Sequence, residues 1–148
     1  MKNKLILAIC LMFVLTGCSY VNISSIRMPG TEMQTLKKFY VKKRSTDKRG
    51  IDLMIRDQLI AMGFEAVTGK VNYEPEEFDA IVTYTDRWMW DMANYLLQLT
   101  IYIKNTDTGY IGSAGKSFRT SLDRKPPEYM AKEILEEVFK NKKLVQES

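Results

Sequence analysis

The sequence contains no histidine and only two cysteines, Cys10 and Cys18, among its 148 residues. Without histidine, neither Ser-His-Asp nor Cys-His catalysis can be assembled, and no imidazole can hold a haem. Two cysteines alone are too few for a zinc site of the usual Cys/His type, and no CxxC pair offers redox chemistry. Any enzyme built on this chain would therefore have to use carboxylates, Lys, Tyr or a Ser-Lys pair.

The chain also lacks an apolar run long enough to cross a bilayer. The longest such run, Leu5 to Leu15, spans about half of the roughly 20 residues that a transmembrane helix needs. It follows the positively charged start Met1-Lys2-Asn3-Lys4 and leads into Leu15-Thr16-Gly17-Cys18. A basic start, a short apolar run and small residues before a cysteine resemble a bacterial lipoprotein signal with its lipobox.

The lipobox resemblance implies cleavage between Gly17 and Cys18. It further implies a diacylglycerol thioether on the Cys18 sulfur and an acyl chain such as palmitate on its new amino group. Several chains on one residue give the stable membrane anchoring that a single chain does not. Ser19 stands where an aspartate retains many lipoproteins at the inner membrane, which implies the periplasmic face of the outer membrane in a Gram-negative host. The alternative is an ordinary secretory signal with an incidental cysteine.

The positive charge of the chain is small once the signal is removed. Loss of Lys2 and Lys4 leaves 20 Lys and Arg against 18 Asp and Glu, so the formal net charge falls from +4 to +2. Charges of both signs are interspersed, and no RNP-like, helix-turn-helix or zinc-finger pattern organises the basic ones. Gly115-Lys116-Ser117 lacks the upstream glycine of a phosphate-binding loop and continues as a strand. We therefore expect neither nucleic acid nor nucleotide as a partner.

The acidic residues show no pattern typical of a catalytic or metal site. Glu74, Glu76, Glu77 and Asp79 lie in one loop, without the alternation and glycine of an oxygen-ligand calcium site. Asp86 and Asp91 would be the carboxylate pair of a glycoside hydrolase, but two acidic residues near each other do not establish one. We expect no catalytic residues, no metal and no cofactor.

Composition divides the chain into a signal peptide (1–17), a lipidated N-terminus with a flexible tether (18–34) and one domain (35–148). The tether prediction rests on polar residues, Pro29 and Gly30, which interrupt any apolar period. Fully extended from Ser19, such a tether would span about 50 to 55 Å. The remaining length is typical of a single domain with one core.

Hydrophobic periodicity predicts the secondary structure of that domain. Apolar residues at three- and four-residue steps predict a helix over 50–62, with Gly63 as its left-handed cap, and a second helix over 128–142. Before the first helix, Ser45-Thr46-Asp47 predicts a turn and a helix cap. Alternation or β-branched runs predict five strands, at 35–43, 64–68, 79–90, 95–104 and 110–120. The order β-α-β-β-β-β-α favours a single α+β domain with a mostly antiparallel twisted sheet of about four to five strands and two helices on one face. Gly112 and Gly115 in the last strand predict a bulge or a close backbone approach.

One cluster of large side chains is a candidate partner surface. Tyr84, Trp88 and Trp90 fall on one side of the predicted strand, and Met92 follows in the turn. Aromatic and methionine side chains are enriched in contact patches. The alternative is that they cap the core beneath a helix.

The lipobox and the element order together are similar to small envelope lipoproteins. Met62-Gly63-Phe64, the strand opening Phe78-Asp79-Ala80-Ile81-Val82 and the turn Asp107-Thr108-Gly109 resemble the N-terminal domain of TolB and the domain of penicillin-binding-protein activator lipoproteins. The resemblance implies a non-enzymatic interaction or assembly role in the envelope, with an envelope protein as partner and the bilayer contacted through Cys18. A ligand-binding lipoprotein, holding a small molecule or glycan between sheet and helix, and a small carboxylate hydrolase are the alternatives.

Overall fold

The structure, a computed structural model, describes residues 21–69 and 77–140. These residues form one α+β domain in which a six-stranded mixed sheet carries two helices. The strands are β1 (Val21–Arg27), β2 (Lys38–Lys42), β3 (Glu65–Gly69), β4 (Ala80–Asp91), β5 (Ala93–Asn105) and β6 (Ile111–Arg119). The helices are α2 (Ile51–Ala61) and α3 (Pro127–Lys140), with a short 3-10 turn, η2 (Ser121–Asp123), before α3.

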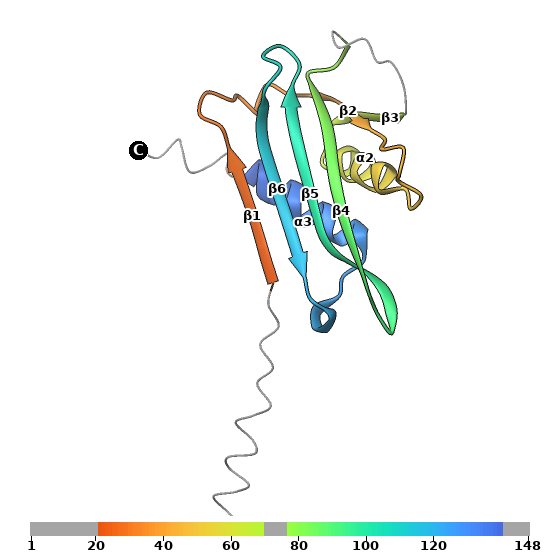
Figure 1. The fold of residues 1–148 in the computed structure, drawn as a ribbon. Helices are drawn as coiled ribbons and strands as arrows, with labels where there is room; N and C mark the ends of the chain where they lie inside the picture. The colour runs from red at the N-terminus through yellow and green to blue at the C-terminus, as the bar shows by residue number, and fades with distance from the viewer. Residues whose placement is uncertain (1–20, 70–76, 141–148) are drawn as a thin grey trace, which may run out of the picture.

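The sheet has the strand order β1-β6-β5-β4-β2-β3. Its first four strands are antiparallel neighbours, whereas β2 runs parallel to both β3 and β4. Parallel strands need a crossover connection, which α2 supplies between β2 and β3. Figure 1 shows both helices on the same face of the sheet, and none of the described elements covers the opposite face.

The core lies between the helices and the covered face of the sheet. It is built from aliphatic residues of β4, β5, α2 and α3, together with Phe39 and Tyr84. Phe39 contacts Phe64 and Phe139 edge-on, at ring separations of 5.1 and 6.0 Å, and so joins β2 to the end of α2 and to α3. Neither of the two helices in the described part of the chain is long and apolar enough to cross a membrane.

The predicted fold class and all the predicted elements are confirmed. Helix α2 ends as expected, because Gly63 adopts a φ of 89°. Its N–H then donates to the carbonyl of Ile60 and the N–H of Phe64 to that of Leu59, which satisfies the last carbonyls of the helix. The predicted end of the second helix, at 141–142, lies outside the described residues.

The segment predicted as a flexible tether is in part a strand, so this expectation needs correction. Val21–Arg27 is β1, and it pairs with β6 over its whole length, from Val21 opposite Arg119 to Arg27 opposite Ser113. Met33, also in the expected tether, is buried in the core. The sheet therefore has six strands where four to five are predicted, and in the sequence only Ser19 and Tyr20 separate Cys18 from the first residue of β1.

Strand β5 departs from strict alternation near one end. The pairing with β4 shifts between Arg87 and Trp88, so that Arg87 lies opposite Gln98 but Trp88 lies opposite Leu96. An extra residue of this kind is a β-bulge, which re-aims the side chains beyond it and increases the local twist. Leu96 consequently joins the core cluster, a placement that a strict period of two does not predict.

Candidate interaction surface

The β4–β5 hairpin runs past the helices at the end of the sheet where β1 begins (Figure 1). Beyond the bulge, Trp90 lies opposite Asn94 and Asp91 lies opposite Ala93, which leaves Met92 alone at the turn. Met92 has a φ of 58°, the only positive value of a non-glycine residue in the described parts of the chain. This end of the hairpin therefore presents side chains away from the core.

The four residues of the predicted partner surface are divided between the core and the exterior. Tyr84 is buried, and Trp88 is half-buried and packs against the core. Trp90 is 72% exposed and Met92 is 91% exposed. Tyr84 and Trp88 therefore fit the alternative of a place in the core, whereas Trp90 and Met92, beyond the bulge, remain candidates for a partner surface.

Trp88 is held in place by two contacts, one at the edge of its indole ring and one over a face of the ring. Its Nε1 donates to Oδ2 of Asp86 at 2.8 Å, and the guanidinium of Arg49 lies 3.7 Å from the ring centroid. Asp86 in turn accepts a hydrogen bond from Arg44 in an ion pair. These contacts fix the root of the hairpin to the loop that precedes α2.

A second element reaches the same end of the domain. Arg124, just after η2, donates to the main-chain carbonyl of Asp91 at 2.7 Å and to its Oδ2 at 3.2 Å. The Arg124 guanidinium also lies 4.8 Å from the ring centroid of Tyr95. Leu122, in η2, is 75% exposed. We call Trp90, Met92 and Leu122 the hairpin-end patch, since Arg124 ties the loop that carries Leu122 to the hairpin.

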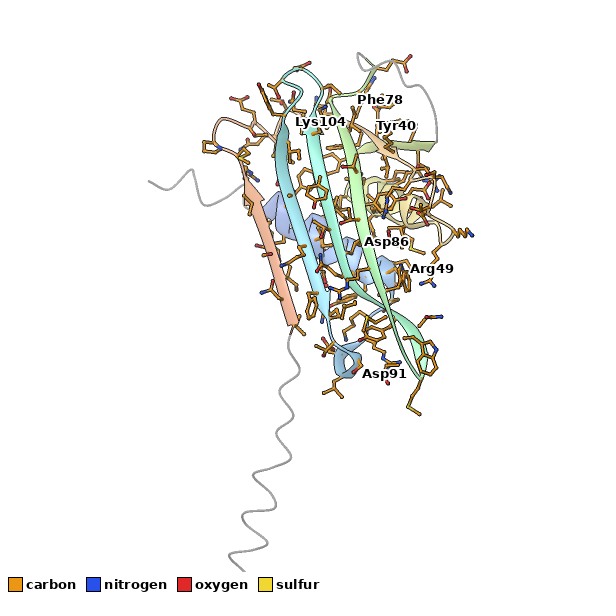
Figure 2. The ribbon with its side chains drawn as sticks, in the orientation of Figure 1. Tyr40, Arg49, Phe78, Asp86, Asp91 and Lys104 are labelled. Carbon is orange, nitrogen blue, oxygen red and sulfur yellow. The ribbon has the colours of Figure 1, made fainter. Side chains whose placement is uncertain are left out.

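The carboxylates considered for glycoside hydrolysis do not come together. Asp86 and Asp91 are five residues apart on β4, which corresponds to about 16 Å along a strand. Glycosidase carboxylates lie within roughly 10 Å of each other. Figure 2 shows Asp86 beside the helices and Asp91 at the hairpin end, and each is engaged in its own ion pair.

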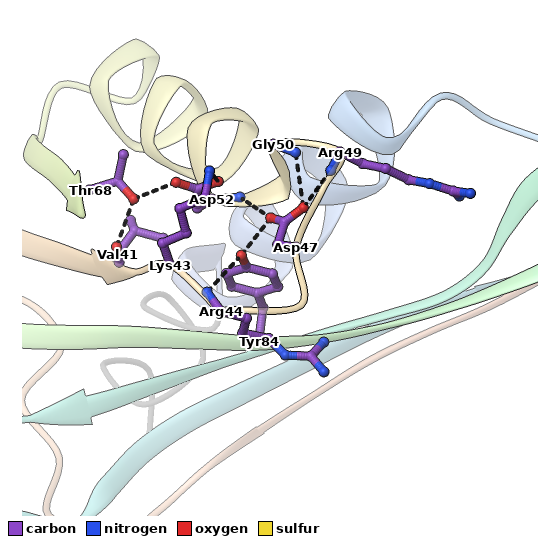
Figure 3. A network of polar contacts seen from close by, with 9 residues as sticks. All are labelled: Val41, Lys43, Arg44, Asp47, Arg49, Gly50, Asp52, Thr68 and Tyr84. Carbon is purple, nitrogen blue, oxygen red and sulfur yellow. Dashed lines mark hydrogen bonds and ion pairs between the residues drawn. The ribbon is translucent and has the colours of Figure 1, made fainter. Parts of the chain in front are cut away.

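Tyr84 belongs to a polar network at the start of α2, shown in Figure 3. The hydroxyl of Tyr84 donates to Oδ2 of Asp47 at 2.6 Å. Oδ1 of Asp47 accepts the main-chain N–H groups of Arg49 and Gly50, at 2.8 and 2.9 Å. The N–H of Asp52, in the first turn of α2, lies 3.3 Å from Oδ2. Asp47 therefore caps the helix from outside it, as the turn chemistry of Ser45-Thr46-Asp47 predicts.

This network shifts two pKa values in opposite directions. Burial would raise the pKa of Asp47, but the hydrogen bond from Tyr84 and the three main-chain N–H groups hold it below its ordinary value of 3.8. Burial raises the pKa of Tyr84, and the hydrogen bond to Asp47 raises it further. Asp47 is thus kept ionised and Tyr84 protonated, which suits a structural cap.

Asp52 is buried beside this network and is contacted by one side chain on β3 and by one that follows β2. Its Oδ2 lies 2.8 Å from Oγ1 of Thr68 on β3, and its Oδ1 lies 3.3 Å from Nζ of Lys43. Thr68 Oγ1 is also 2.8 Å from the carbonyl of Val41 on β2. The carboxylate therefore joins α2 to the two parallel strands.

A second buried ion cluster joins β6 to α3. Arg119 is buried and donates to both Asp123 in η2 and Glu133 in α3. Burial would lower the pKa of Arg119, but its hydrogen bonds to Glu133 and Asp123 raise it. Ser117 Oγ donates to Oε1 of Glu133 at 2.6 Å. Gly115-Lys116-Ser117 accordingly lies within a strand, as expected, and Ser117 serves this cluster.

An open groove of about 760 Å³ lies at the opposite end of the sheet. Its mainly apolar walls come from the chain after β1 and from the β5–β6 turn: Met28, Pro29, Gly30, Thr31, Lys104, Thr108, Gly109, Tyr110, Ile111 and Gly112. A smaller groove of about 440 Å³ has basic and hydroxyl walls, including Lys42, Lys43 and Arg44. Neither lies between the sheet and the helices, where the ligand-binding alternative expects a cavity.

The remaining sequence predictions fall partly outside the described residues. Cys18 and Gly17 lie there, as do Glu74 and Glu76 of the acidic loop. Asp79 is described, and its Oδ2 accepts the N–H groups of Lys37 and Lys38 at 2.7 and 2.9 Å, which fixes the start of β2. Within 21–69 and 77–140, no three acidic or sulfur side chains gather in a way that would hold a metal ion.

The sequence does not predict two exposed features. Leu122 lies between the last predicted strand and the second predicted helix, and at Tyr110 and Ile111 the pattern predicts only a strand. The available signal for Leu122 is its isolation: it is the one apolar side chain between Ser121 and Lys125. Nothing in the sequence shows that η2 brings it to the same end as Trp90, because that depends on the pairing of β6.

No protein-family model and no curated protein matches the sequence. Among solved structures, the PelC dodecamer from Paraburkholderia phytofirmans is similar at a TM-score of 0.56 and 12% identity, over 81% of this chain and 95% of that chain. A PDZ domain protein from Parabacteroides distasonis has a TM-score of 0.51 and 10% identity. That match covers 97% of this chain but only 40% of the other.

A minor lipoprotein from Acinetobacter baumannii also matches, over 72% of this chain and 87% of that chain at 14% identity. Its TM-score of 0.29 is too low to carry an argument about fold. At these identities, the likeness to PelC and to the PDZ domain protein concerns the fold alone. It shows that a similar arrangement of strands and helices occurs in known structures, including one solved as a dodecamer.

Proposed function

We propose that this protein is a lipid-anchored envelope protein that acts by binding other proteins and not by catalysis. Cys18 carries the lipid, and the domain stands on the periplasmic face of the outer membrane. The lipobox sequence Leu15-Thr16-Gly17-Cys18 supports the anchor, and Ser19 supports the outer membrane. The role implied by the loose resemblance to the TolB N-terminal domain and to activator lipoproteins stays a prediction from the sequence.

The observation that carries the binding role is how the described domain uses its polar and apolar groups. The polar clusters around Asp47, Asp52 and Arg119 are closed by partners from neighbouring elements, which leaves their charges engaged in structural contacts. Large apolar side chains, in contrast, lie exposed at both ends of the sheet. Exposed apolar groups gathered at particular places are typical of interaction sites.

The fold likeness to PelC supports assembly as the form that this binding takes. That neighbour is a dodecamer, and the sheet of this protein has one face that no described element covers (Figure 1). Strands β1 and β3 also stand at its two edges. A heterologous contact between unlike surfaces of successive copies closes into a ring when the rotation permits it.

Two measurements test this proposal. Mass spectrometry of the N-terminal peptide from the native envelope should show a chain that begins at Cys18 and carries diacylglycerol and acyl chains. Crosslinking of the lipidated protein in its own envelope should then give discrete complexes, either with copies of itself or with a stoichiometric protein partner. An N-terminus elsewhere or an unmodified thiol would contradict the anchor, and a solely monomeric protein would contradict the binding role.

A ligand-binding role is the second candidate, and the groove lined by Tyr110 and Met28 favours it. Its volume of about 760 Å³ falls in the range of small-molecule sites, although it is more open than most. Native mass spectrometry separates the two roles: a single small molecule retained at one per chain, and lost in Tyr110→Ser, would replace the assembly proposal. Tyr129→Ser, which removes an exposed tyrosine away from the groove, is the matched control.

A further inference from the structure

The distance from the anchor to the folded domain is short. Because β1 begins at Val21, three residue steps separate it from Cys18. Even fully extended, three steps cover about 10 Å. If Cys18 bears the lipid, the start of β1 must therefore lie within about 10 Å of the membrane surface.

The hairpin end reaches at least as far in the same direction. Val21 lies opposite Arg119, and Phe118 lies opposite Gln98, so the start of β1 is level with about residue 97 of β5. From Arg87, the partner of Gln98, β4 continues four more residues to Asp91. Four to five strand residues extend about 13 to 16 Å. If the strands stand perpendicular to the membrane, the tip of the hairpin therefore lies farther from the start of β1, in the direction of the membrane, than Cys18 can reach.

The chemistry of this tip suits the interface of a bilayer. Trp90, Met92 and Leu122 are all more than 70% exposed. Tryptophan is the residue most typical of the membrane interface, where its ring meets both the apolar chains and the headgroups. The nearby charges are engaged in ion pairs, Arg124 with Asp91 and Lys125 with Asp123. No single sign of charge dominates this end, so contact with lipid does not depend on anionic headgroups.

The backbone conformation of Met92 is a second indication that the side chain at this tip has a role other than stabilising the fold. A φ of 58° is unfavourable for a side chain with a Cβ, and glycine or asparagine would adopt it more readily. Met92 is nevertheless the most exposed large apolar residue of the described chain, at 91%. Strain of this kind persists where something other than the stability of the fold favours the residue.

We propose that the hairpin-end patch inserts into the bilayer interface as a second membrane contact beside the lipid on Cys18. This inference rests on the proposed lipidation of Cys18 and goes beyond it by fixing the orientation of the domain. Sheet strands then stand upright on the membrane, and the groove of Tyr110 and Met28 faces away from it. Over the 13 residues of β5, that is a height of about 40 Å.

Quenching by brominated lipids tests the orientation. The mature lipidated protein is reconstituted in phosphatidylethanolamine–phosphatidylglycerol vesicles whose acyl chains carry bromine. In Trp88→Phe, Trp90 is the sole tryptophan, since the chain has two. We expect its emission to shift to the blue on reconstitution and to be largely quenched, with no dependence on the phosphatidylglycerol fraction. Circular dichroism of the variant shows whether replacing Trp88 leaves the fold intact.

The matched control moves the probe to the far end. Tyr110 is 79% exposed, so Tyr110→Trp in a chain with Trp88→Phe and Trp90→Phe reports from a comparably exposed position. We expect this probe to be neither shifted nor quenched. Equal quenching at both positions, or none at Trp90, would overturn the upright orientation. A blue shift at Trp90 without quenching would also overturn it, because a protein would then cover the patch.

The same sample separates failure of this inference from failure of the proposed anchor. Mass spectrometry of its N-terminal peptide shows whether Cys18 carries lipid. A lipidated chain with unquenched Trp90 overturns the membrane contact and leaves the anchor standing. An unmodified Cys18 overturns both, since the reach from Cys18 to Val21 then no longer places the domain at a membrane.

Discussion

At the scale of single residues, Asp47 makes contacts both within its own turn and with a distant strand. Its carboxylate accepts N–H groups from the turn before α2 and the hydroxyl of Tyr84 on β4, thirty-seven residues away. The sequence predicts its capping role, because Asp before a periodic apolar segment is typical of helix starts. The Tyr84 contact is not predictable, since it depends on where the sheet places β4. That contact gives the hydroxyl of Tyr84 a partner while its ring packs in the core.

Replacing Asp47 with Ala should lower the free energy of unfolding by about 2 kcal/mol, because a helix cap and a hydrogen-bond partner of a buried hydroxyl are lost together. Urea unfolding at pH 7 measures the change. Asp57→Ala, on the exposed side of α2, is the control and should change it by less than about 0.5 kcal/mol. Similar losses in both variants would contradict the role given to Asp47.

The pH dependence of this effect has a definite sign. Because the folded protein lowers the pKa of Asp47, its contribution to stability is present above the ordinary value of 3.8 and is lost as the pH falls through the lowered value. Wild type should therefore lose more stability than Asp47→Asn as the pH is taken below about 4. Acid unfolding of both proteins, followed by circular dichroism, checks this. Parallel acid curves would show that the carboxylate of Asp47 makes no such contribution.

Arg119 offers a second prediction at this scale. Arg119→Met leaves Glu133 and Asp123 without the cation between them, and should lower the free energy of unfolding by about 3 kcal/mol. Adding Glu133→Gln and Asp123→Asn removes the uncompensated charges and should restore part of the loss. Arg56→Met, which breaks a more exposed pair with Asp57, should cost under about 1 kcal/mol. A triple variant no more stable than Arg119→Met would contradict the electrostatic explanation.

At the scale of elements, periodicity predicts most of the fold and misses what depends on distant pairing. Helix α2 and the β5–β6 hairpin are evident from local pattern alone. Strand β1 is not, because Val-Asn-Ile-Ser-Ser-Ile-Arg alternates weakly and becomes a strand only by pairing with β6, about ninety residues later. The separation of Trp88 from Trp90 likewise depends on a bulge and on where the helices end. The residue types therefore indicate a candidate contact surface, but they do not show which of these residues are exposed.

Close packing of β6 against α3 gives a prediction at this scale. A Cβ on Gly115 would lie 2.6 Å from Cγ2 of Ile134 and 2.7 Å from Cγ2 of Val138, so the helix would have to move. Gly115→Ala should therefore lower the free energy of unfolding by about 1 to 3 kcal/mol. This loss is expected even though alanine within a strand is normally more stable than glycine. Thermal or urea unfolding measures the loss.

A second substitution shows whether the close approach is the cause. Val138→Ala alone removes buried methyl groups and is destabilising. If Gly115→Ala clashes with Val138, the double variant should be more stable than the sum of the two single effects predicts, because the smaller side chain makes room. Strictly additive effects would mean that the strand tolerates a methyl group without displacing α3.

At the scale of the whole molecule, the short link to Cys18 and the hairpin-end patch are two independent constraints on one orientation. Inserting a 12-residue Gly/Ser spacer after Ser19 lengthens the link to a root-mean-square reach of about 20 Å. That lowers the effective concentration of the patch at the membrane by roughly tenfold, equivalent to about 1.4 kcal/mol. Burial of a large apolar side chain is worth about 1.5 to 3 kcal/mol, so a three-residue patch should offset this loss.

We therefore expect the spacer alone to leave most of the lipid quenching of Trp90 in place. Met92→Ser with Leu122→Ser alone should also leave most of it, because the short link still holds the hairpin at the surface. The spacer and both substitutions together should lower it most, since Trp90 alone then remains of the patch and the link no longer holds it at the surface. Quenching of Trp90 in brominated vesicles measures all three proteins beside wild type. Full loss with the spacer alone would mean that the patch has no affinity for lipid of its own, and that the link to Cys18 by itself sets how this domain stands.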